Sequence, residues 1–311
     1  MIMDKESNTS KRIDEIYPST LYHYTSLEKF KCMLQFGTLR FKLSTQSNDL
    51  LDTHFIINLI KQLQFFSDDT SDEKQQLLKI LIGYFQRDEY ISTRLSFVSC
   101  FTDIADSRLL WDAYTINRPP LEKCEIGKDK YCQNTLTSYN GVCVGFKRDS
   151  IRQLLSAADG SCDFESAYLM PIYYSEQEQL AALDYFANEA WEIFEKIKLE
   201  PDQSQSLIHH IVTGYQLDYG EFKGPPHFKT IALKKCFVQA VFSFIRNIEI
   251  TAPIFKHSFW HEESEYRAVL CRHKSMDNAT AIVKGSESNL FVDLPINCDM
   301  IDNIILGPTF S

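Results

Sequence analysis

The sequence predicts an α+β fold, in which one sheet is assembled from both ends of the chain around an inserted helical subdomain. Strand-like apolar segments cluster before residue 175 and after residue 264, and the segments between them have helical periodicity. Both Gly-x-Gly-x-x-Gly and Gly-x-x-x-x-Gly-Lys-Ser/Thr are missing, which disfavours a doubly wound nucleotide-binding fold. We therefore expect a single domain over 1–311 with a helical insertion at about 176–246.

The first half of the chain alternates short strands with helices. Ser26 is expected to cap a helix that Gly37 closes, because a cap oxygen accepts from free backbone N–H groups and glycine tolerates the left-handed conformation. Residues 117–138 are rich in proline and charge and predict a surface excursion. The expected strands are 20–24, 38–43, 95–101, 142–146 and 167–174. The expected helices are 27–36, 49–60, 72–85, 107–114 and 150–156.

The second half begins with amphipathic segments and returns to strands. The expected helices are 176–199, 203–215 and 230–246, and the expected strands are 265–271, 281–283 and 301–306. The N-terminal fifteen residues are polar and alternate in charge, so no signal peptide is expected, and no apolar run is long enough to span a bilayer.

Composition limits the function classes. With 32 basic and 42 acidic residues the net charge is −10, so binding of DNA or anionic membranes through bulk charge is disfavoured, while a local basic groove stays possible. The nine cysteines are an odd number and form no Cys-x-x-Cys pair, which is typical of reduced cysteines packed in a core. A cytoplasmic location without membrane contact is expected.

Two polar and aromatic clusters precede residue 115. His23, Tyr24, Thr25 and Ser26 combine an imidazole, hydroxyls and free helix N–H groups, which suits recognition of a ribose or phosphate. The alternative is an edge-of-core histidine followed by an ordinary helix cap. Trp111 and Tyr114 share a helix face after Asp106-Ser107 and could form a platform for a planar ring. Aromatic pairs at this spacing are also common in cores.

A third cluster lies near the C-terminus. If a strand starts near Glu263, then Glu263, Glu265 and Arg267 share one of its faces, at a desolvation cost unless they pair or meet a polar ligand. A salt-bridged edge strand is the alternative. His257 and His261 are four residues apart, but His-Glu-x-x-His is absent and no cysteine pair supplements them, so no metal site is expected.

These segments resemble an uncharacterised bacterial family, domain of unknown function twenty-nine seventy-one. The resemblance covers most of the chain in the right order and is most specific in its last block. The matching motifs are Leu-Tyr-His-Tyr-Thr-Ser-Leu-Glu from residue 21, Gly37-Thr38-Leu39-Arg40, Asn48-Asp49, Cys100-Phe101-Thr102, Asp106-Ser107, Trp111 to Tyr114, Gly141-Val142-Cys143, Lys256, Trp-x-x-Glu-x-Glu-Tyr-Arg from residue 260, and Ile-x-Leu-Gly-Pro from residue 304.

The opening also looks like the first strand of ADP-ribosyltransferases, which implies an ADP-ribosyltransferase-like split mixed sheet and NAD as substrate. In that superfamily a first-strand histidine, a middle aromatic or hydroxyl residue and a late Glu-x-Glu occur in this order. Tyr24 departs from the glycine common at its position. The resemblance implies catalytic roles for Glu265, at the ribose 2′-hydroxyl, and for Glu263, which would orient or deprotonate the acceptor. It implies that the NAD-binding residues are His23, Tyr24, Thr25, Ser26, Trp111, Tyr114 and Arg267.

The implied function is NAD-dependent ADP-ribosylation of a nucleic-acid or protein acceptor, as in a bacterial toxin or anti-phage defence effector with an antitoxin or defence-system partner. One alternative is a non-catalytic module that binds a nucleotide or a partner on the same scaffold. Another is a nucleotide-processing enzyme, such as an NAD glycohydrolase or a phosphotransferase acting on RNA. His23, Tyr114 and Glu265 are expected to converge on one cleft.

Overall fold

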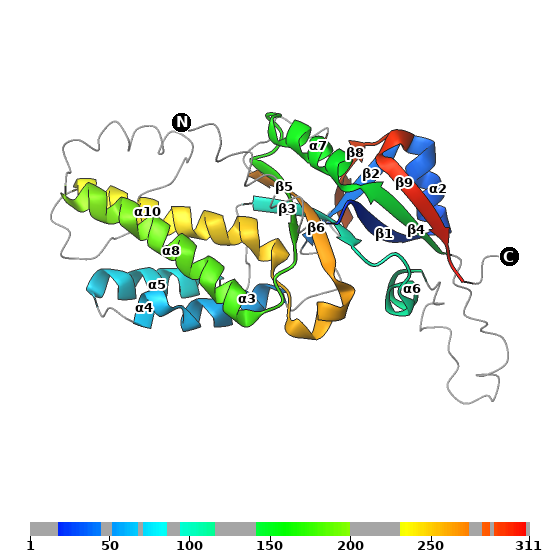
Figure 1. Cartoon of the computed structure of the whole chain (residues 1–311). Helices are drawn as coiled ribbons and strands as arrows, with labels where there is room; N and C mark the ends of the chain where they lie inside the picture. Colours follow the sequence, from blue (N-terminus) through cyan, green and yellow to red (C-terminus); the bar gives the residue numbers. More distant parts are fainter. Residues whose placement is uncertain are drawn as a thin grey trace, which may run out of the picture. The chain divides into compact units, whose positions relative to one another are not determined.

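The computed structural model describes residues 18–44, 52–67, 71–85, 94–115, 141–199, 231–273, 282–286 and 289–308. They form an α+β protein with a nine-stranded, mostly antiparallel sheet, which confirms that the fold is α+β (Figure 1). The chain folds into two compact units, each built from separate segments. Unit 1 comprises Met1–Ser47, Leu95–Ile172 and Trp260–Ser311, and unit 2 comprises Asn48–Arg94 and Tyr173–Phe259.

The sheet runs in the order β7-β8-β2-β3-β1-β4-β9, and β6 pairs with β3 and β5. Both the first strand and the last strand pair with β4, in antiparallel registers. Segments far apart in the sequence therefore lie side by side at this end of the sheet. The strands are β1 (Thr20–Ser26), β2 (Thr38–Leu43), β3 (Arg94–Thr102), β4 (Gly141–Lys147), β5 (Ser166–Pro171), β6 (Glu265–His273), β7 (Val283–Ser286), β8 (Asn289–Pro295) and β9 (Ile301–Leu306).

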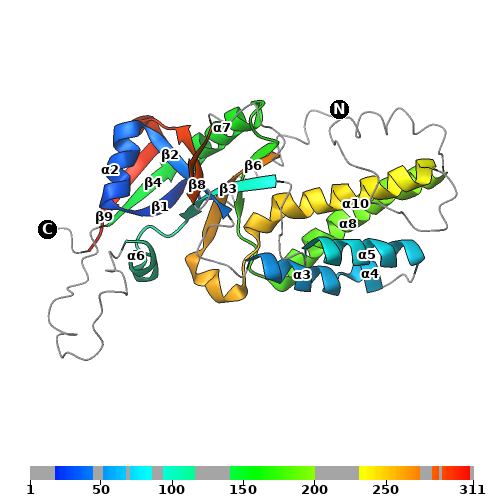
Figure 2. The same ribbon diagram turned by 180° about the vertical axis from the view of Figure 1, so that it is seen from behind.

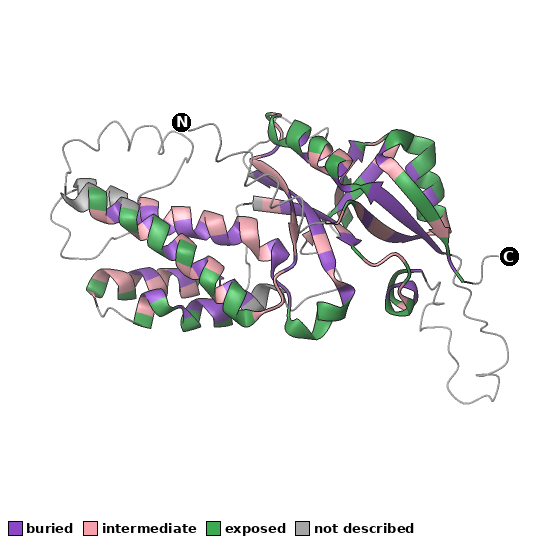
Figure 3. Cartoon of the chain, in the orientation of Figure 1, coloured by how far each residue is buried: buried purple, intermediate pink, exposed green. Residues whose placement is uncertain are grey.

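The main core of unit 1 lies on one face of this sheet. Alternate residues of the central strands point into it, among them Leu21, Phe101 and Val144. Helices α2 (Leu27–Phe36) and α7 (Arg148–Asp159) bury their apolar sides in the same core. Figure 3 shows the contrast between the buried central strands and the exposed outer side of α2. Burial of this face fixes the register of the strands.

A second, smaller core lies on the opposite face, beneath α6 (Arg108–Tyr114). Tyr24 and Cys143 are direct partners in the pairing of β1 with β4, and both pack against Trp111 in this core. Gly141, at the start of β4, is needed here because any Cβ at this position would collide with the side chain of Thr115, directly after α6. This close approach positions α6 over the face that carries the candidate site.

The caps of α2 are confirmed. The Ser26 hydroxyl accepts a hydrogen bond from the Lys29 backbone N–H at 3.3 Å, and Gly37 ends the helix with a φ of 58°. At α6, Ser107 occupies the cap position, but its side chain makes no capping hydrogen bond. Its backbone N–H donates instead to the Tyr24 hydroxyl, at 2.9 Å. The start of α6 is therefore held by a hydrogen bond to a residue of β1 and not by the side chain of its own cap residue.

Other elements differ from the expected bounds. Helix α7 begins at Arg148, with Lys147 at its cap, rather than after Asp149 or Ser150. Strand β5 ends at Pro171 rather than at residue 174, although the Ile172 N–H still donates to the Glu265 carbonyl at 2.9 Å. Strand β8 was not predicted, although its core-facing side chains alternate as a strand requires. Its outward Asp293 and terminal Pro295 weaken the apolar pattern by which strands are recognised.

Unit 2 is helical. Its helices α8 and α10 pack along each other, as do α3 and α5, and Figure 2 shows the four side by side. Asp184 of α8 accepts a hydrogen bond from the Phe65 backbone N–H at the start of α4, at 3.0 Å. The expected helical insertion at about 176–246 corresponds to α8 and α10, and the helices between residues 52 and 85 belong to the same unit. The helices are α3 (Asp52–Gln62), α4 (Gln64–Ser67), α5 (Asp72–Phe85), α8 (Glu176–Leu199) and α10 (Ile231–Thr251).

Two expected segments, the helix at 203–215 and the excursion at 117–138, lie outside the described residues. Among the helices that the structure describes, none is both long and apolar enough to cross a bilayer.

Candidate functional site

Four of the predicted site residues lie together in unit 1, and we call them the acidic cluster: Tyr114, Glu263, Glu265 and Arg267. Tyr114 ends α6, Glu263 ends the short 3₁₀-helix η4 (Ser258–Glu263), and Glu265 begins β6. The Tyr114 hydroxyl donates to Glu263 Oε2 at 3.5 Å, across 149 positions of sequence. The middle aromatic segment and the late Glu-x-Glu segment therefore meet, as the sequence predicted.

Glu265 and Arg267 form a buried ion pair. Arg267 Nε donates to Glu265 Oε1 at 2.8 Å and Nη2 donates to Oε2 at 3.4 Å, and each side chain is about one-twentieth exposed (5% and 6%). They are two positions apart on β6, so they share one face of the strand. The neighbouring Tyr266 and Ala268 pack on the main core, which places the ion pair on the opposite side of the sheet. The predicted pairing on one strand face is confirmed for these two residues.

Glu263 is not part of this alternation, contrary to prediction. The intervening Ser264 has a φ of 43°, in the left-handed region that non-glycine residues seldom adopt, and β6 starts only after it. The Glu263 carbonyl accepts a hydrogen bond from the Thr102 hydroxyl at 2.8 Å, which anchors the end of η4 to β3. The two carboxylates are thus held by different elements on either side of a backbone turn.

Tyr114 is a hydrogen-bond donor in this cluster. Its side chain is 44% exposed, but its hydroxyl end lies among acidic groups. Burial of the hydroxyl raises the pKa of Tyr114 strongly, and the neighbouring Glu263, Cys100 and Glu265 raise it further, while Arg267 lowers it. Since the phenol keeps its proton, Tyr114 can donate a hydrogen bond to a ligand or carboxylate but cannot act as a base.

Trp111 does not form the open platform with Tyr114 that their spacing suggested, because it packs against Tyr24 instead. The rings of Trp111 and Tyr24 pack edge to face at a centroid distance of 4.8 Å, and Trp111 is only 1% exposed. Trp111 Nε1 donates to Asp106 at 2.7 Å, and the Tyr24 hydroxyl donates to the Ile104 carbonyl at 3.0 Å. In this arrangement both rings belong to the small core, and Tyr114 alone of the three aromatic candidates reaches the surface.

The Tyr24 hydroxyl is expected to stabilise the fold measurably. Tyr24→Phe removes the partner of both the Ile104 carbonyl and the Ser107 N–H, and the loss of these two part-buried hydrogen bonds should cost about 1–3 kcal/mol. Urea unfolding monitored by circular dichroism measures the loss. Tyr185→Phe, at a position 64% exposed on α8, is the matched control and should change stability by less than about 0.5 kcal/mol. Equal effects of the two substitutions would contradict the role of the Tyr24 hydroxyl.

His23 lies away from the acidic cluster, so the expected convergence of His23 with Glu265 is wrong. In the β1–β4 pairing His23 lies opposite Val144, on the face of the main core, and its ring packs 5.7 Å from that of Phe101. Its Nδ1 donates to the Cys100 carbonyl at 2.8 Å, which fixes the tautomer with the proton on Nδ1 in the neutral ring. Strand alternation separates it from Glu265, which lies on the other face.

Burial lowers the pKa of His23 below its ordinary value of 6.5, and this predicts a pH-dependent stability. Between the lowered native value and 6.5 the unfolded chain holds more protons than the native protein, so the free energy of unfolding rises with pH there. The stabilisation is present above 6.5 and declines as the pH falls below it. Urea unfolding at several pH values should show a smaller decline for His23→Gln than for the wild type. Identical pH profiles would remove His23 as the cause.

Thr25 and Ser26 are occupied in the fold. Thr25 is 4% exposed and lies opposite Val142 on the face of the main core, and the Ser26 hydroxyl caps α2. Neither side chain lies with the acidic cluster. The remaining candidates of the first strand thus serve the core and the helix cap, the alternative that the sequence left open.

Two residues near the site were not predicted to belong to it. Thr102 holds Glu263 through its hydroxyl, and Cys100 lies close enough to Tyr114 to raise its pKa. Their position on alternate residues of β3 is the signal that could have indicated them, because both point to the face of the acidic cluster. Burial raises the pKa of the Cys143 thiol to about 12, so this cysteine stays protonated and is a poor nucleophile.

The acidic cluster offers two carboxylates, a phenol donor and a guanidinium that orients one carboxylate. Such a set can hold a hydroxylated or cationic ligand and stabilise positive charge that develops on it. Within the described ranges, no three His, Cys, Asp or Glu side chains are grouped to hold a metal ion. The chain matches no protein-family model, no curated protein and no solved structure.

Proposed function

We propose that the protein is an NAD-dependent ADP-ribosyltransferase whose reaction centre is the acidic cluster. The observation that carries the proposal is the meeting of Tyr114 with Glu263 and Glu265 on one side of the sheet. The resemblance of the Trp-x-x-Glu-x-Glu-Tyr-Arg block to the superfamily's late Glu-x-Glu supports it. The proposal leaves out His23, Thr25 and Ser26, which lie elsewhere.

The chemistry suits these groups. The bond between the nicotinamide nitrogen and C1′ of the ribose breaks, the electron pair leaves with nicotinamide, and the ribose acquires oxocarbenium character. Glu265 accepts a hydrogen bond from the ribose 2′-hydroxyl and stabilises the developing positive charge, while Arg267 holds its carboxylate in place. Glu263 takes the proton of the acceptor as the acceptor bonds to C1′. Tyr114, which is partly exposed and protonated, stacks beside the nicotinamide ring.

The sheet supports the finer part of the fold proposal. Strand β3 pairs with β2 at Phe97 and Val98, whereas it pairs with β1 at Thr102. The neighbouring strands thus leave β3 at different points along its length. We infer that this is the opening of an ADP-ribosyltransferase-like split sheet.

A non-catalytic binding module is the second candidate, and one observation favours it. Both oxygens of Glu265 are engaged by Arg267 in a buried ion pair, an arrangement that can be purely structural. In a catalyst the carboxylate must share its oxygens between Arg267 and the ribose. In a binding module the ion pair remains intact when ligand binds.

Incubation of the protein with NAD labelled in its adenylate half, in the presence of protein, DNA and RNA acceptors, tests the proposal. Release of nicotinamide together with transfer of label to a macromolecule is the expected result and would identify the acceptor class. Nicotinamide release without transfer would instead identify an NAD glycohydrolase. NAD binding without release would identify a binding module, and no binding of NAD would overturn all three. A toxin or anti-phage role, with an antitoxin or defence partner, applies only in the first case.

A further inference from the structure

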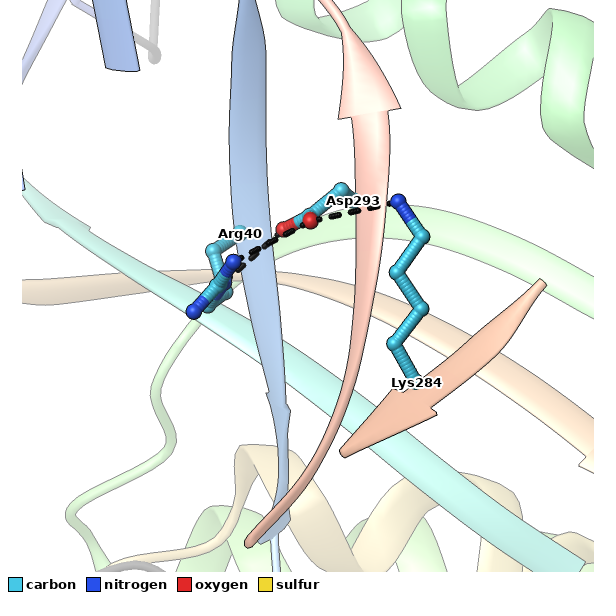
Figure 4. A network of polar contacts seen from close by, with 3 residues as sticks. All are labelled: Arg40, Lys284 and Asp293. Carbon is cyan, nitrogen blue, oxygen red and sulfur yellow. Dashed lines mark hydrogen bonds and ion pairs between the residues drawn. The ribbon is translucent and has the colours of Figure 1, made fainter. Parts of the chain in front are cut away.

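The outer face of strands β7, β8 and β2 carries a cluster that the proposed function does not use, and we call it the Arg40 platform. Its members are Arg40, Lys42, Lys284, Phe291 and Asp293. The intervening residues of these strands point into the main core, so alternation places the platform on the opposite side of the sheet. Figure 4 shows Asp293 on β8 between Arg40 of β2 and Lys284 of β7.

Arg40 is held in one orientation. Its Nε and Nη2 donate to the two carboxylate oxygens of Asp293, at 2.9 and 3.1 Å, and its guanidinium carbon lies 3.6 Å above the centroid of the Phe291 ring. The Asp293 side chain is 8% exposed, whereas that of Arg40 is 51% exposed. One planar face of the guanidinium therefore lies on the ring, its edge is bonded, and the side chain is still half open to solvent. A guanidinium fixed in this way loses little conformational entropy when a flat group stacks on it.

Two lysines flank this plane. Lys42 on β2 and Lys284 on β7 are the direct strand partners of Phe291, on either side of it, and both are exposed. Lys284 Nζ lies 3.5 Å from Asp293, and the Lys42 ammonium makes no hydrogen bond or ion pair within the part of the chain that the structure describes. Three cations and one carboxylate leave the platform with a net charge of +2, on a chain whose net charge is −10.

We propose that the Arg40 platform binds single-stranded nucleic acid, with a base stacked on the Arg40 guanidinium and adjacent phosphates at Lys42 and Lys284. Bases of single strands stack on arginine planes and aromatic rings, and lysines beside them follow the backbone. The local positive charge is complementary to the phosphates and opposite to the charge of the whole chain. An acidic peptide would satisfy the lysines but has no planar group for the guanidinium. Binding here does not depend on the acidic cluster being catalytic.

Fluorescence anisotropy with three labelled strands of about twelve nucleotides tests this: oligo-dT, oligo-U and an abasic strand with the same number of phosphates. At about 50 mM salt we expect both base-containing strands to bind the full-length protein about tenfold more tightly than the abasic strand. Arg40→Lys keeps the charge but removes the plane, so it should abolish the difference between the base-containing and abasic strands. A preference for the U strand over the dT strand would identify RNA as the ligand.

Lys42→Gln separates the phosphate contact from the stacking. It should weaken all three strands equally and reduce the slope of log K against log salt concentration by about 0.7. Lys196→Gln is the matched control, because Lys196 is an exposed lysine on α8 paired with Glu192. Equal binding of base-containing and abasic strands, or an equal effect of Lys196→Gln, would overturn the proposal. Displacement of the strands by an acidic peptide at equal charge concentration would also overturn it, in favour of a protein ligand.

Discussion

Glu265→Gln is expected to lower the rate of nicotinamide release about a hundred- to a thousandfold while NAD affinity changes little. The substitution keeps the shape of the side chain and its acceptor oxygen for Arg267, but it removes the negative charge. Loss of one such preorganised electrostatic contact costs about 3–4 kcal/mol at the transition state. Before bond cleavage the ribose carries little positive charge, so the ground state depends on the carboxylate much less.

Nicotinamide release and NAD binding should be measured on the wild type and the variant, at temperatures well below both melting points. Glu262→Gln, at the exposed neighbour of Glu263, is the control for a general change of charge near the site. Equal rates in wild type and Glu265→Gln would remove Glu265 from the mechanism. If Glu265 has only a structural role, Glu265→Gln should lower the melting temperature without a selective effect on the rate of nicotinamide release.

Arg267→Leu should destabilise unit 1 by about 3–5 kcal/mol, because it leaves the Glu265 carboxylate buried without the guanidinium that pairs with it. Glu265→Leu should have a similar effect by leaving Arg267 buried. The double variant Glu265→Leu/Arg267→Leu should lose less stability than either single variant, because two apolar side chains of similar volume need no partners. Urea unfolding of the four proteins forms a double-mutant cycle.

The pair Glu192 and Lys196 on α8 provides the comparison. It is solvent-exposed, so its coupling energy should be only about 0.3–0.5 kcal/mol. Additive effects of Glu265→Leu and Arg267→Leu would contradict the view that the buried ion pair acts as a unit. Strong coupling together with unchanged NAD turnover in Glu265→Gln would identify the pair as structural.

The elements that local chemistry determines were predictable. Ser26 and Gly37 mark the ends of α2 because capping depends on a few adjacent residues. Glu265 and Arg267 share a face because the strand period is two. The break at Ser264 was not predictable, since a non-glycine residue with positive φ is held there by its surroundings and leaves no compositional signal.

The separation of His23 from Glu265 has a different cause. Alternation within β1 shows that His23 and Tyr24 point to opposite faces, but it does not show which face carries the carboxylates. That depends on how β1 and β6 lie against β3, a strand far from β6 in sequence. The Arg40 platform was missed for the same reason, because Arg40 and Asp293 are 253 positions apart. Pairing over such distances is a property of the folded chain rather than of a local pattern.

The strand order bears on how the molecule reaches its native state. Direct partners in the sheet include Tyr22 with Thr102, Arg40 with Asp293 and Val144 with Ile304, so most of the pairing joins remote segments. The hairpin of β7 and β8 is the local exception. Contacts between remote segments stabilise the chain only after long loops have closed, and closing these loops costs entropy. Folding is therefore expected to be slow. During synthesis β4 can pair with β1 before β9 has been made. Until β9 emerges, the edge of β4 that β9 covers in the native sheet is free to pair with other chains.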